Sequence, residues 1–298
     1  MRRARPKTNR GRLFHRVRRH RVNYITILPS LITILNGVFG FISIVLASRA
    51  NEKGFSADSP YFAWAGYMVL LAMFADMLDG RLARMSHSTS SFGGQLDSLC
   101  DMVSFGIAPA FLMLQIVSVK LEPIMPFSGG LLHRFIWLAA LAYISCAAIR
   151  LARFNVENED SEAHHMSFVG LPSPAAAGAI VSLIIFHQTE MPDLDILIYA
   201  LPFLTVFAAV LMVSQVRYPH VLNTYLRGKK PFRHLIQVLF YLSLVAVGKW
   251  QVALVLIFWA FAVAGLAKSL YARLMHHEEP LAGKVQDLAT PPGQDARV

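Results

Sequence analysis

Four aspartates lie within a short stretch of this sequence, DMLDGRLARMSHSTSSFGGQLDSLCD, at spacings that match the α-helical repeat. Asp76 and Asp79 are three residues apart, and Asp97 and Asp101 are four apart, so each pair shares one helical face. A segment rich in Ser, Thr and Gly separates the pairs, which predicts two antiparallel helices whose carboxylates face one another. Such all-oxygen donor sets favour hard divalent cations, Mg²⁺, Mn²⁺ or Ca²⁺, over zinc.

Small residues accompany the aspartates on both predicted faces. Gly80 and Ala83 continue the first face, and Gly93 begins the second. Small residues at helical spacing permit close helix packing, and a glycine beside a metal ligand also leaves room for a large ligand against the backbone. Helix-end charges that reach the membrane interface are the alternative explanation. They would account for one or two carboxylates, whereas four on facing stripes predict a metal site.

The elements that carry these residues are apolar enough to lie in a membrane. Of the 298 residues, 55% are apolar and only 15% are charged, and the mean hydropathy is +0.47; a soluble domain carries about 25% charged residues. Several apolar runs reach the length of about 20 residues that spans a bilayer. We therefore predict an all-α, polytopic integral-membrane bundle of about eight transmembrane helices. The predicted spans lie near 25–48, 61–82, 94–118, 134–154, 172–188, 196–216, 233–248 and 251–271.

Basic residues are distributed unevenly between the predicted loops. Ten of the 28 Lys and Arg precede residue 22 and flank the first apolar run. Such a cluster indicates a cytoplasmic, interfacial amino terminus that contacts anionic lipids, rather than a nucleic-acid-binding segment. With this orientation, 23 Lys and Arg lie on the cytoplasmic side and 5 on the outer side. The positive-inside rule therefore places both termini and the four aspartates in or near the cytoplasm.

Composition divides the chain into four regions. Residues 1–23 form the basic interfacial segment, 24–216 hold the helices with the candidate chemistry, 217–274 add two further transmembrane helices, and 275–298 are a disordered cytoplasmic tail. The two cysteines, Cys100 and Cys146, lie in apolar helical stretches without metal-binding spacing. A zinc site and a disulfide framework are both disfavoured by this arrangement.

The aspartate segment resembles the signature of the CDP-alcohol phosphotransferase family at every fixed position. The resemblance implies a helical membrane fold in which the four aspartates hold two divalent metal ions. It also implies that a CDP-linked substrate lies over Gly80 and Ala83, and that Asp101 is the general base. The matching positions are Asp76, Asp79, Gly80, Ala83, Arg84, Gly93, Asp97 and Asp101.

A wider similarity narrows this to the phosphatidylserine synthase group of that family. It is carried by LDSLCDMVSFGIAPA (96–110), AIRLARFN (148–155) and FVGLPSPAAAG (168–178), together with Asn36 and Gly37. The group's reaction transfers a phosphatidyl group from CDP-diacylglycerol to L-serine and releases CMP. The similarity thus implies a multi-pass enzyme of a bacterial-type inner membrane, with its active site on the cytoplasmic side.

Three further polar residues are candidates for substrate contacts. Arg150 and Arg153, at the cytoplasmic end of the fourth predicted span, suit the carboxylate of serine or a lipid phosphate, because a guanidinium group binds oxyanions in a bidentate manner. Positive-inside topology alone is the alternative explanation. Asn36 lies within an apolar helix, where an amide needs a partner. A helix–helix hydrogen bond and a contact to cytidine or the diphosphate both remain open for it.

Two other kinds of function are compatible with the same aspartates. An acceptor of the glycerol phosphate, inositol or choline type would keep the chemistry and change only the product. A divalent-cation transporter would use the aspartates for transport, but the internal repeats typical of transporters are not evident. Association into a homodimer is left open.

Overall fold

The computed structural model describes six stretches of the chain, and all regular secondary structure within them is helical. They are residues 10–50, 60–86, 91–121, 130–160, 170–216 and 248–276. Within these residues no strand occurs, so the all-α prediction is confirmed. The elements are α1 (Arg10–Arg49), α2 (Pro60–Ser86), α3 (Ser91–Asp101), the π-helix η1 (Met102–Ile107), α4 (Ala108–Leu121), α5 (Leu131–Asp160), α6 (Ser173–Glu190), α7 (Asp195–Val213) and α10 (Trp250–His276).

Six of the described helical segments are long and apolar enough to cross a membrane, so the chain is a multi-pass membrane protein. Each lies where the sequence predicts a span. The predicted span at 172–188 corresponds to α6, which is helical but is not one of the six, and the span predicted at 233–248 lies outside the described residues. The six segments are Ser30–Arg49, Pro60–Leu82, Phe92–Leu121, Leu131–Val156, Asp195–Val213 and Trp250–Ser269.

α6 is the central helix of the bundle and differs from the others in how completely it is buried. It packs against α2, α7 and α10 and also contacts α4. Every residue from Ala176 to Ile185 is buried, so all faces of this part of the helix are covered. A helix enclosed by protein on all sides is expected to be apolar all round rather than amphipathic. By contrast, α1, α5 and α7 expose large apolar residues, such as Phe41, Leu138 and Phe203, as helices that face lipid do.

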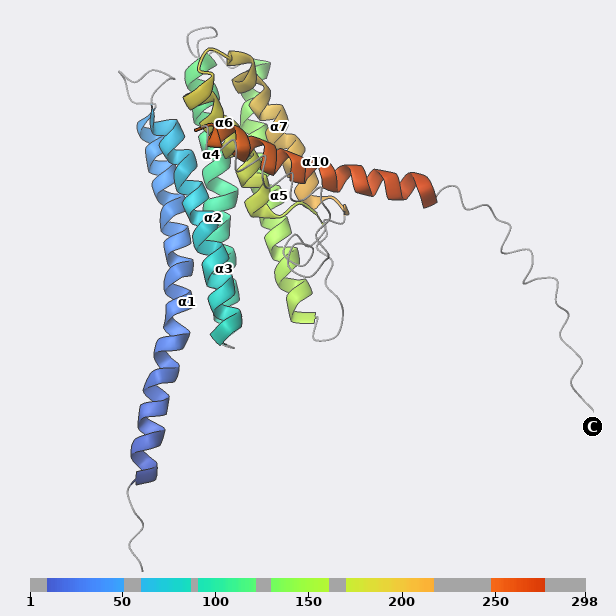
Figure 1. Ribbon diagram of the computed structural model, residues 1–298. Helices are drawn as coiled ribbons and strands as arrows, with labels where there is room; N and C mark the ends of the chain where they lie inside the picture. The colour runs from blue at the N-terminus through green and yellow to red at the C-terminus, as the bar shows by residue number, and fades with distance from the viewer. Residues whose placement is uncertain are drawn as a thin grey trace, which may run out of the picture.

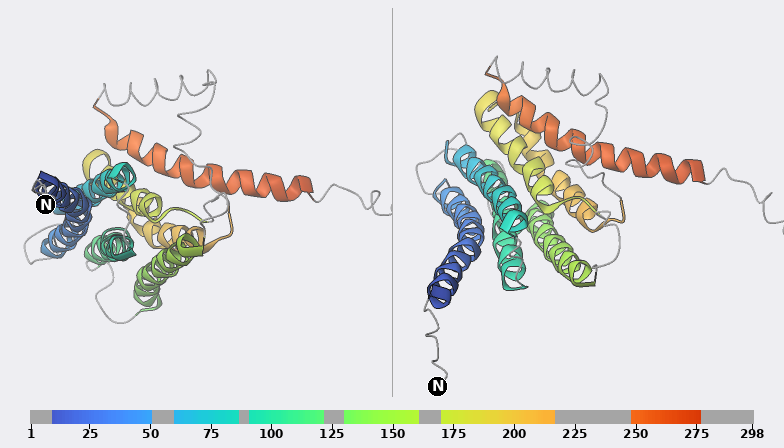
Figure 2. Two further views of the ribbon diagram at one scale, coloured as in Figure 1. Left: turned by 90° about the horizontal axis from the view of Figure 1, so that it is seen from below. Right: turned by 60° about the horizontal axis from the view of Figure 1, so that its bottom comes forward.

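α1 and α10 extend beyond the rest of the bundle (Figure 1). The first part of α1 runs past the ends of its neighbours, and α10 crosses the bundle at a steep angle, as the end-on view in Figure 2 also shows. α10 is held by its contact with α6, where the ring of Phe258 lies against Gly178 and Trp259 Nε1 donates a hydrogen bond to the Ala179 carbonyl at 3.1 Å.

Glycines bring α1 unusually close to α3 and to η1, which continues directly from it. A Cβ atom on Gly37 would lie 3.1 Å from Cys100 Sγ, and one on Gly40 would lie 2.7 Å from Ser104 Cα. The Ser104 hydroxyl donates to the Asn36 carbonyl at 2.8 Å across this contact. Small residues thus allow the two backbones to pack at short distance, and this packing holds the amino-terminal helix against the helix that carries Asp97 and Asp101.

The loop before α6 is fixed by backbone hydrogen bonds to the end of α7. Gly170 has a φ of +88°, and a side chain there would lie 2.2 Å from the Met212 carbonyl oxygen, so only glycine fits. Its N–H donates to the Val216 carbonyl at 2.8 Å, and Leu171 N–H donates to the Leu211 carbonyl at 3.0 Å. The turn places Ser173 at the first position of α6.

Candidate active site

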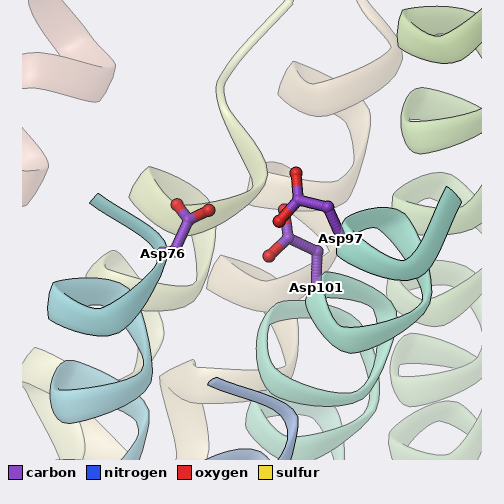
Figure 3. Close-up of side chains that lie close together, drawn as sticks. All are labelled: Asp76, Asp97 and Asp101. Atoms are coloured by element: carbon purple, nitrogen blue, oxygen red, sulfur yellow. The ribbon is translucent and has the colours of Figure 1, made fainter. Parts of the chain in front are cut away.

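The carboxyl-terminal half of α2 and the short helix α3 bring three aspartates together. Asp76 of α2 and Asp97 and Asp101 of α3 each offer one carboxylate oxygen, and these oxygens all lie within 4.8 Å of one another. Figure 3 shows the three side chains converging from the two helices. The facing stripes expected from the i, i+3 and i, i+4 spacings therefore meet at these three residues.

Asp79 borders this group without contributing an oxygen to it. Its side chain is 5% exposed and accepts hydrogen bonds from the Thr33 side chain and the Gly80 backbone N–H. Its Oδ2 atom is buried without a hydrogen-bond partner. Of the four predicted aspartates, three thus have converging carboxylates. The fourth, Asp79, is hydrogen-bonded to α1 and has one oxygen without a hydrogen-bond partner.

Asn36 connects α1 to the acidic group. Its side chain is 0% exposed, and Nδ2 donates to Asp101 Oδ1 at 2.9 Å. The helix–helix hydrogen bond considered for this residue is therefore present, with a carboxylate of the site as its acceptor. Asn36 Oδ1 is buried and accepts no hydrogen bond, so the side chain retains one acceptor for a ligand.

The electrostatics of the group favour a bound cation. Three carboxylates this close repel one another strongly in a medium of low dielectric constant. Within the described residues, the Lys and Arg ion pairs involve Asp195 and Glu190 instead, at the other end of the bundle. Asp97 Oδ1 and Asp79 Oδ2 are buried acceptors without partners, and buried acceptors are rarely left unsatisfied. An all-oxygen set with spare acceptors fits a hard divalent cation.

The small residues of the signature leave space beside the acidic group. A Cβ atom on Gly80 would meet no other atom within 4 Å, so the surface over this residue is open. Gly93 is half-buried near the start of α3. Ala83 and Arg84 belong to α2, but their side chains lie outside the described part of the chain.

The two candidate arginines lie on α5, one turn apart. Arg150 Nη1 donates to the hydroxyl of Ser173 at 3.3 Å, which links α5 to the first residue of α6. Arg153 is half-buried one turn further along the helix. Ser98 Oγ lies 2.9 Å from Asn155 Oδ1 and so links α3 to α5 beside the acidic group.

The sequence analysis did not single out four polar residues that form hydrogen bonds in or beside the site. Thr33, Ser98, Asn155 and Ser173 are common polar residues, and their types carry no metal or catalytic signal. Three of them lie within the quoted segments LDSLCD, RLARFN and GLPSP, so the resemblance contained a signal that residue type alone lacked.

Residues 26–220 match the family model described as CDP-alcohol phosphatidyltransferase. This chain belongs to that family, which confirms the resemblance drawn from the aspartate signature. The match covers α1 from residue 26 through α7 and leaves α10 outside.

Curated relatives support the same assignment. A Helicobacter pylori protein is 32% identical over 230 residues, which cover 76% of this chain and 84% of the relative. A Methanocaldococcus jannaschii protein is 29% identical over 247 residues, 83% of this chain and 96% of the relative. A Saccharomyces cerevisiae protein is 35% identical over 161 residues, 52% of each chain. Each of the three is named a CDP-diacylglycerol–serine O-phosphatidyltransferase.

Proposed function

We propose that this chain is a CDP-diacylglycerol–serine O-phosphatidyltransferase, which transfers a phosphatidyl group to L-serine and releases CMP. The observation that carries the proposal is the convergence of Asp76, Asp97 and Asp101 within the signature of a phosphatidyltransferase family. The choice of serine as acceptor is supported by the names of the relatives. Family membership and the relatives thus supply the reaction class and the acceptor, and the acidic group supplies the place of the chemistry.

Asp76, Asp79, Asp97 and Asp101 would hold the metal, two Mg²⁺ or Mn²⁺ ions, with Ca²⁺ as an alternative. When bound, divalent cations neutralise charge on the diphosphate of CDP-diacylglycerol and make CMP a better leaving group. The chain's own contribution is to hold these four side chains in place. Thr33 fixes Asp79, and Asn36 fixes Asp101.

Asp101 is the proposed general base. The serine hydroxyl oxygen forms a bond to the β-phosphorus, the bond from that phosphorus to the CMP oxygen breaks, and the hydroxyl proton passes to Asp101. An aspartate is a weak base toward an alcohol, so correct orientation of the reacting atoms must supply much of the rate. The hydrogen bond from Asn36 leaves the rest of the Asp101 carboxylate to receive the proton.

The remaining candidate residues would bind the two substrates. The diphosphate and cytidine of CDP-diacylglycerol would lie over the open surface at Gly80, near Ala83, Arg84 and Gly93. Arg150 would bind the carboxylate of serine or a lipid phosphate, with Arg153 one turn away. The Ser173 hydroxyl orients the Arg150 guanidinium group, which favours a fixed oxyanion contact over a freely moving surface arginine.

An acceptor panel tests the proposal. The purified protein, with CDP-diacylglycerol and Mn²⁺ or Mg²⁺, is offered L-serine, glycerol 3-phosphate, inositol or choline, and CMP and the lipid product are identified by mass spectrometry. We expect phosphatidylserine from L-serine alone, and loss of turnover with EDTA or with Asp101→Asn. A faster reaction with another acceptor would reassign the substrate, and uptake of Mn²⁺ into vesicles without CMP release would indicate a transporter.

A further inference from the structure

The carbonyl of Phe105 has lost its usual helical partner. In an α-helix this carbonyl would accept the N–H of the residue four positions on, but that residue is Pro109, which has no N–H and whose ring collides with the same carbonyl. Tyr143 of α5 replaces the missing donor, and its hydroxyl lies 3.0 Å from the Phe105 oxygen. Both residues are 0% exposed, so no water from outside the bundle can take over this role.

The displaced carbonyl coincides with a π-helical turn directly after Asp101. Residues Met102–Ile107 form η1, and the Ala108 N–H donates to the Val103 carbonyl five residues back. Each residue of an α-helix turns the chain by about 100°, so one additional residue rotates α3 against α4 by roughly that angle. This turn therefore determines the direction in which Asp97 and Asp101 project from α3, relative to the buried face of α4.

Tyr143 lies on a face of α5 that also carries a candidate substrate residue. Tyr143, Ala147 and Arg150 follow one another at i, i+4 and i+7, so they share one side of the helix. Ala147 packs against Gly106 of η1, and Arg150 continues to Ser173. The hydrogen bond of the Tyr143 hydroxyl thus ties α5 to η1, which directly follows the helix that bears Asp97 and Asp101.

We propose that Tyr143 is a positioning residue for this transferase. Its hydrogen bond to the Phe105 carbonyl, which Pro109 leaves without an N–H partner, stabilises the π turn. The π turn orients the side chains of Asp97 and Asp101 toward Asp76. The inference rests on the proposed function for its kinetic readout, but not for its readout of metal binding. As a positioning residue, Tyr143 acts without touching substrate or metal. Its effect passes through the Phe105 backbone to the carboxylates.

Two variants test the proposal from opposite sides of the hydrogen bond. Tyr143→Phe removes only the hydroxyl, and Pro109→Ala restores an N–H that pairs with the Phe105 carbonyl and favours a regular α-helix. We expect each to lower kcat by on the order of tenfold or more and to weaken Mn²⁺ binding to the full-length protein, measured by electron paramagnetic resonance without substrate. The KM for CDP-diacylglycerol should change much less. The matched controls are Tyr67→Phe and Pro202→Ala, which remove a tyrosine hydroxyl bonded to Gln251 and a proline inside α7.

The thermal midpoint separates positioning from mere packing. Tyr143→Phe should lower it, and the double variant with Pro109→Ala should recover it, because the carbonyl regains a partner, while kcat and Mn²⁺ affinity stay low. A Tyr143→Phe protein that loses only thermal stability, with wild-type kcat and Mn²⁺ affinity, would overturn the proposal. Should that variant not fold, Pro109→Ala alone decides, and wild-type Mn²⁺ affinity and kcat in it would overturn the proposal. Turnover of L-serine by the wild-type protein tests the proposed function separately, and its absence would overturn that function without bearing on the Mn²⁺-binding result.

Discussion

Three carboxylate oxygens of Asp76, Asp97 and Asp101 within 4.8 Å of one another concentrate charge that the described basic side chains do not offset. Nearby hydrogen-bond donors, Asn36 at Asp101 and Thr33 at Asp79, offset the repulsion only in part. The same three groups that would bind metal should therefore destabilise the metal-free protein.

Asp97→Asn should stabilise the protein in EDTA and inactivate it with metal. The variant removes one like charge and one proposed ligand. Loss of a group that merely supports a metal ligand costs about 10–100-fold in activity or affinity, so loss of the ligand should cost more. The wild type should gain about 2.7 kcal/mol of stability at Mn²⁺ concentrations of 100 times Kd, and the variant much less. Thermal unfolding with EDTA or MnCl₂, together with CMP release, measures both effects.

The control for this experiment is Asp195→Asn, because Asp195 is paired with Lys120 at the other end of the bundle from the acidic group. It should keep both the response to Mn²⁺ and the turnover. An equal response to Mn²⁺ in Asp97→Asn and the wild type would remove Asp97 from the proposed ligands.

Gly80→Ala should separate binding from folding. The added methyl group points into open space, so the fold should tolerate it, and replacing a helical glycine by alanine gains about 0.5–1 kcal/mol. If CDP-diacylglycerol lies over this residue, the methyl group should raise its KM several-fold while the thermal midpoint holds or rises. Gly94→Ala, also into open space, is the matched control. Unchanged kinetics in both variants would place the substrate elsewhere.

At the scale of helices, close backbone contact is the means by which α1 reaches the site. Gly37 and Gly40 bring α1 against Cys100 and Ser104, and this approach allows Asn36 to bond with Asp101. The pattern of an asparagine followed by spaced glycines therefore has a structural role beside any contact with substrate.

Gly40→Ala should force α1 away from η1. The new methyl carbon would lie 2.4 Å from Ser104 Oγ and 2.7 Å from Ser104 Cα, and overpacking of this kind costs about 1–3 kcal/mol. We expect a lower thermal midpoint together with reduced turnover, since Asn36 moves with the helix. Adding Ser104→Ala should not restore either property, because the contact with Cα remains. Full rescue by Ser104→Ala would show that only the hydroxyl is in the way.

For the molecule as a whole, two ion pairs lie at the same end of the bundle. Lys120 at the end of α4 pairs with Asp195 at the start of α7, 3.0 Å apart, and Lys249 before α10 pairs with Glu190 at the end of α6. Both lysines belong to the five basic residues that the positive-inside count places outside. α6 therefore runs between the same two ends as α4, and the acidic group lies toward the opposite end.

Topology reporters test this orientation directly. Fusions that end at residues 121 and 190 should report the outer side, and fusions that end at residues 86, 160 and 216 should report the cytoplasmic side, because basic loops are retained there. The measurement is paired activity of a reporter that works only outside and one that works only inside. The reverse pattern at residues 86 and 160 would place the active site on the outer face.

Local periodicity and composition were sufficient to predict the helices that the structure describes, their membrane-spanning length and the facing acidic residues. Hydropathy over about 20 residues reflects the bilayer thickness, and aspartates three or four residues apart share a face whatever the surrounding fold. Pro109 was also visible in the sequence, and its missing N–H was a signal for the irregular turn that sequence reasoning did not use.

Only the tertiary structure decided which of these groups meet. Asn36 and Asp101 are 65 residues apart, Tyr143 and Phe105 are 38 apart, and both contacts depend on how helices pack rather than on any local pattern. The same packing encloses α6, joins three aspartates and leaves Asp79 beside them. Helix periodicity is a property of neighbouring residues, whereas the direction in which a carboxylate points depends on the rotation of one helix against another.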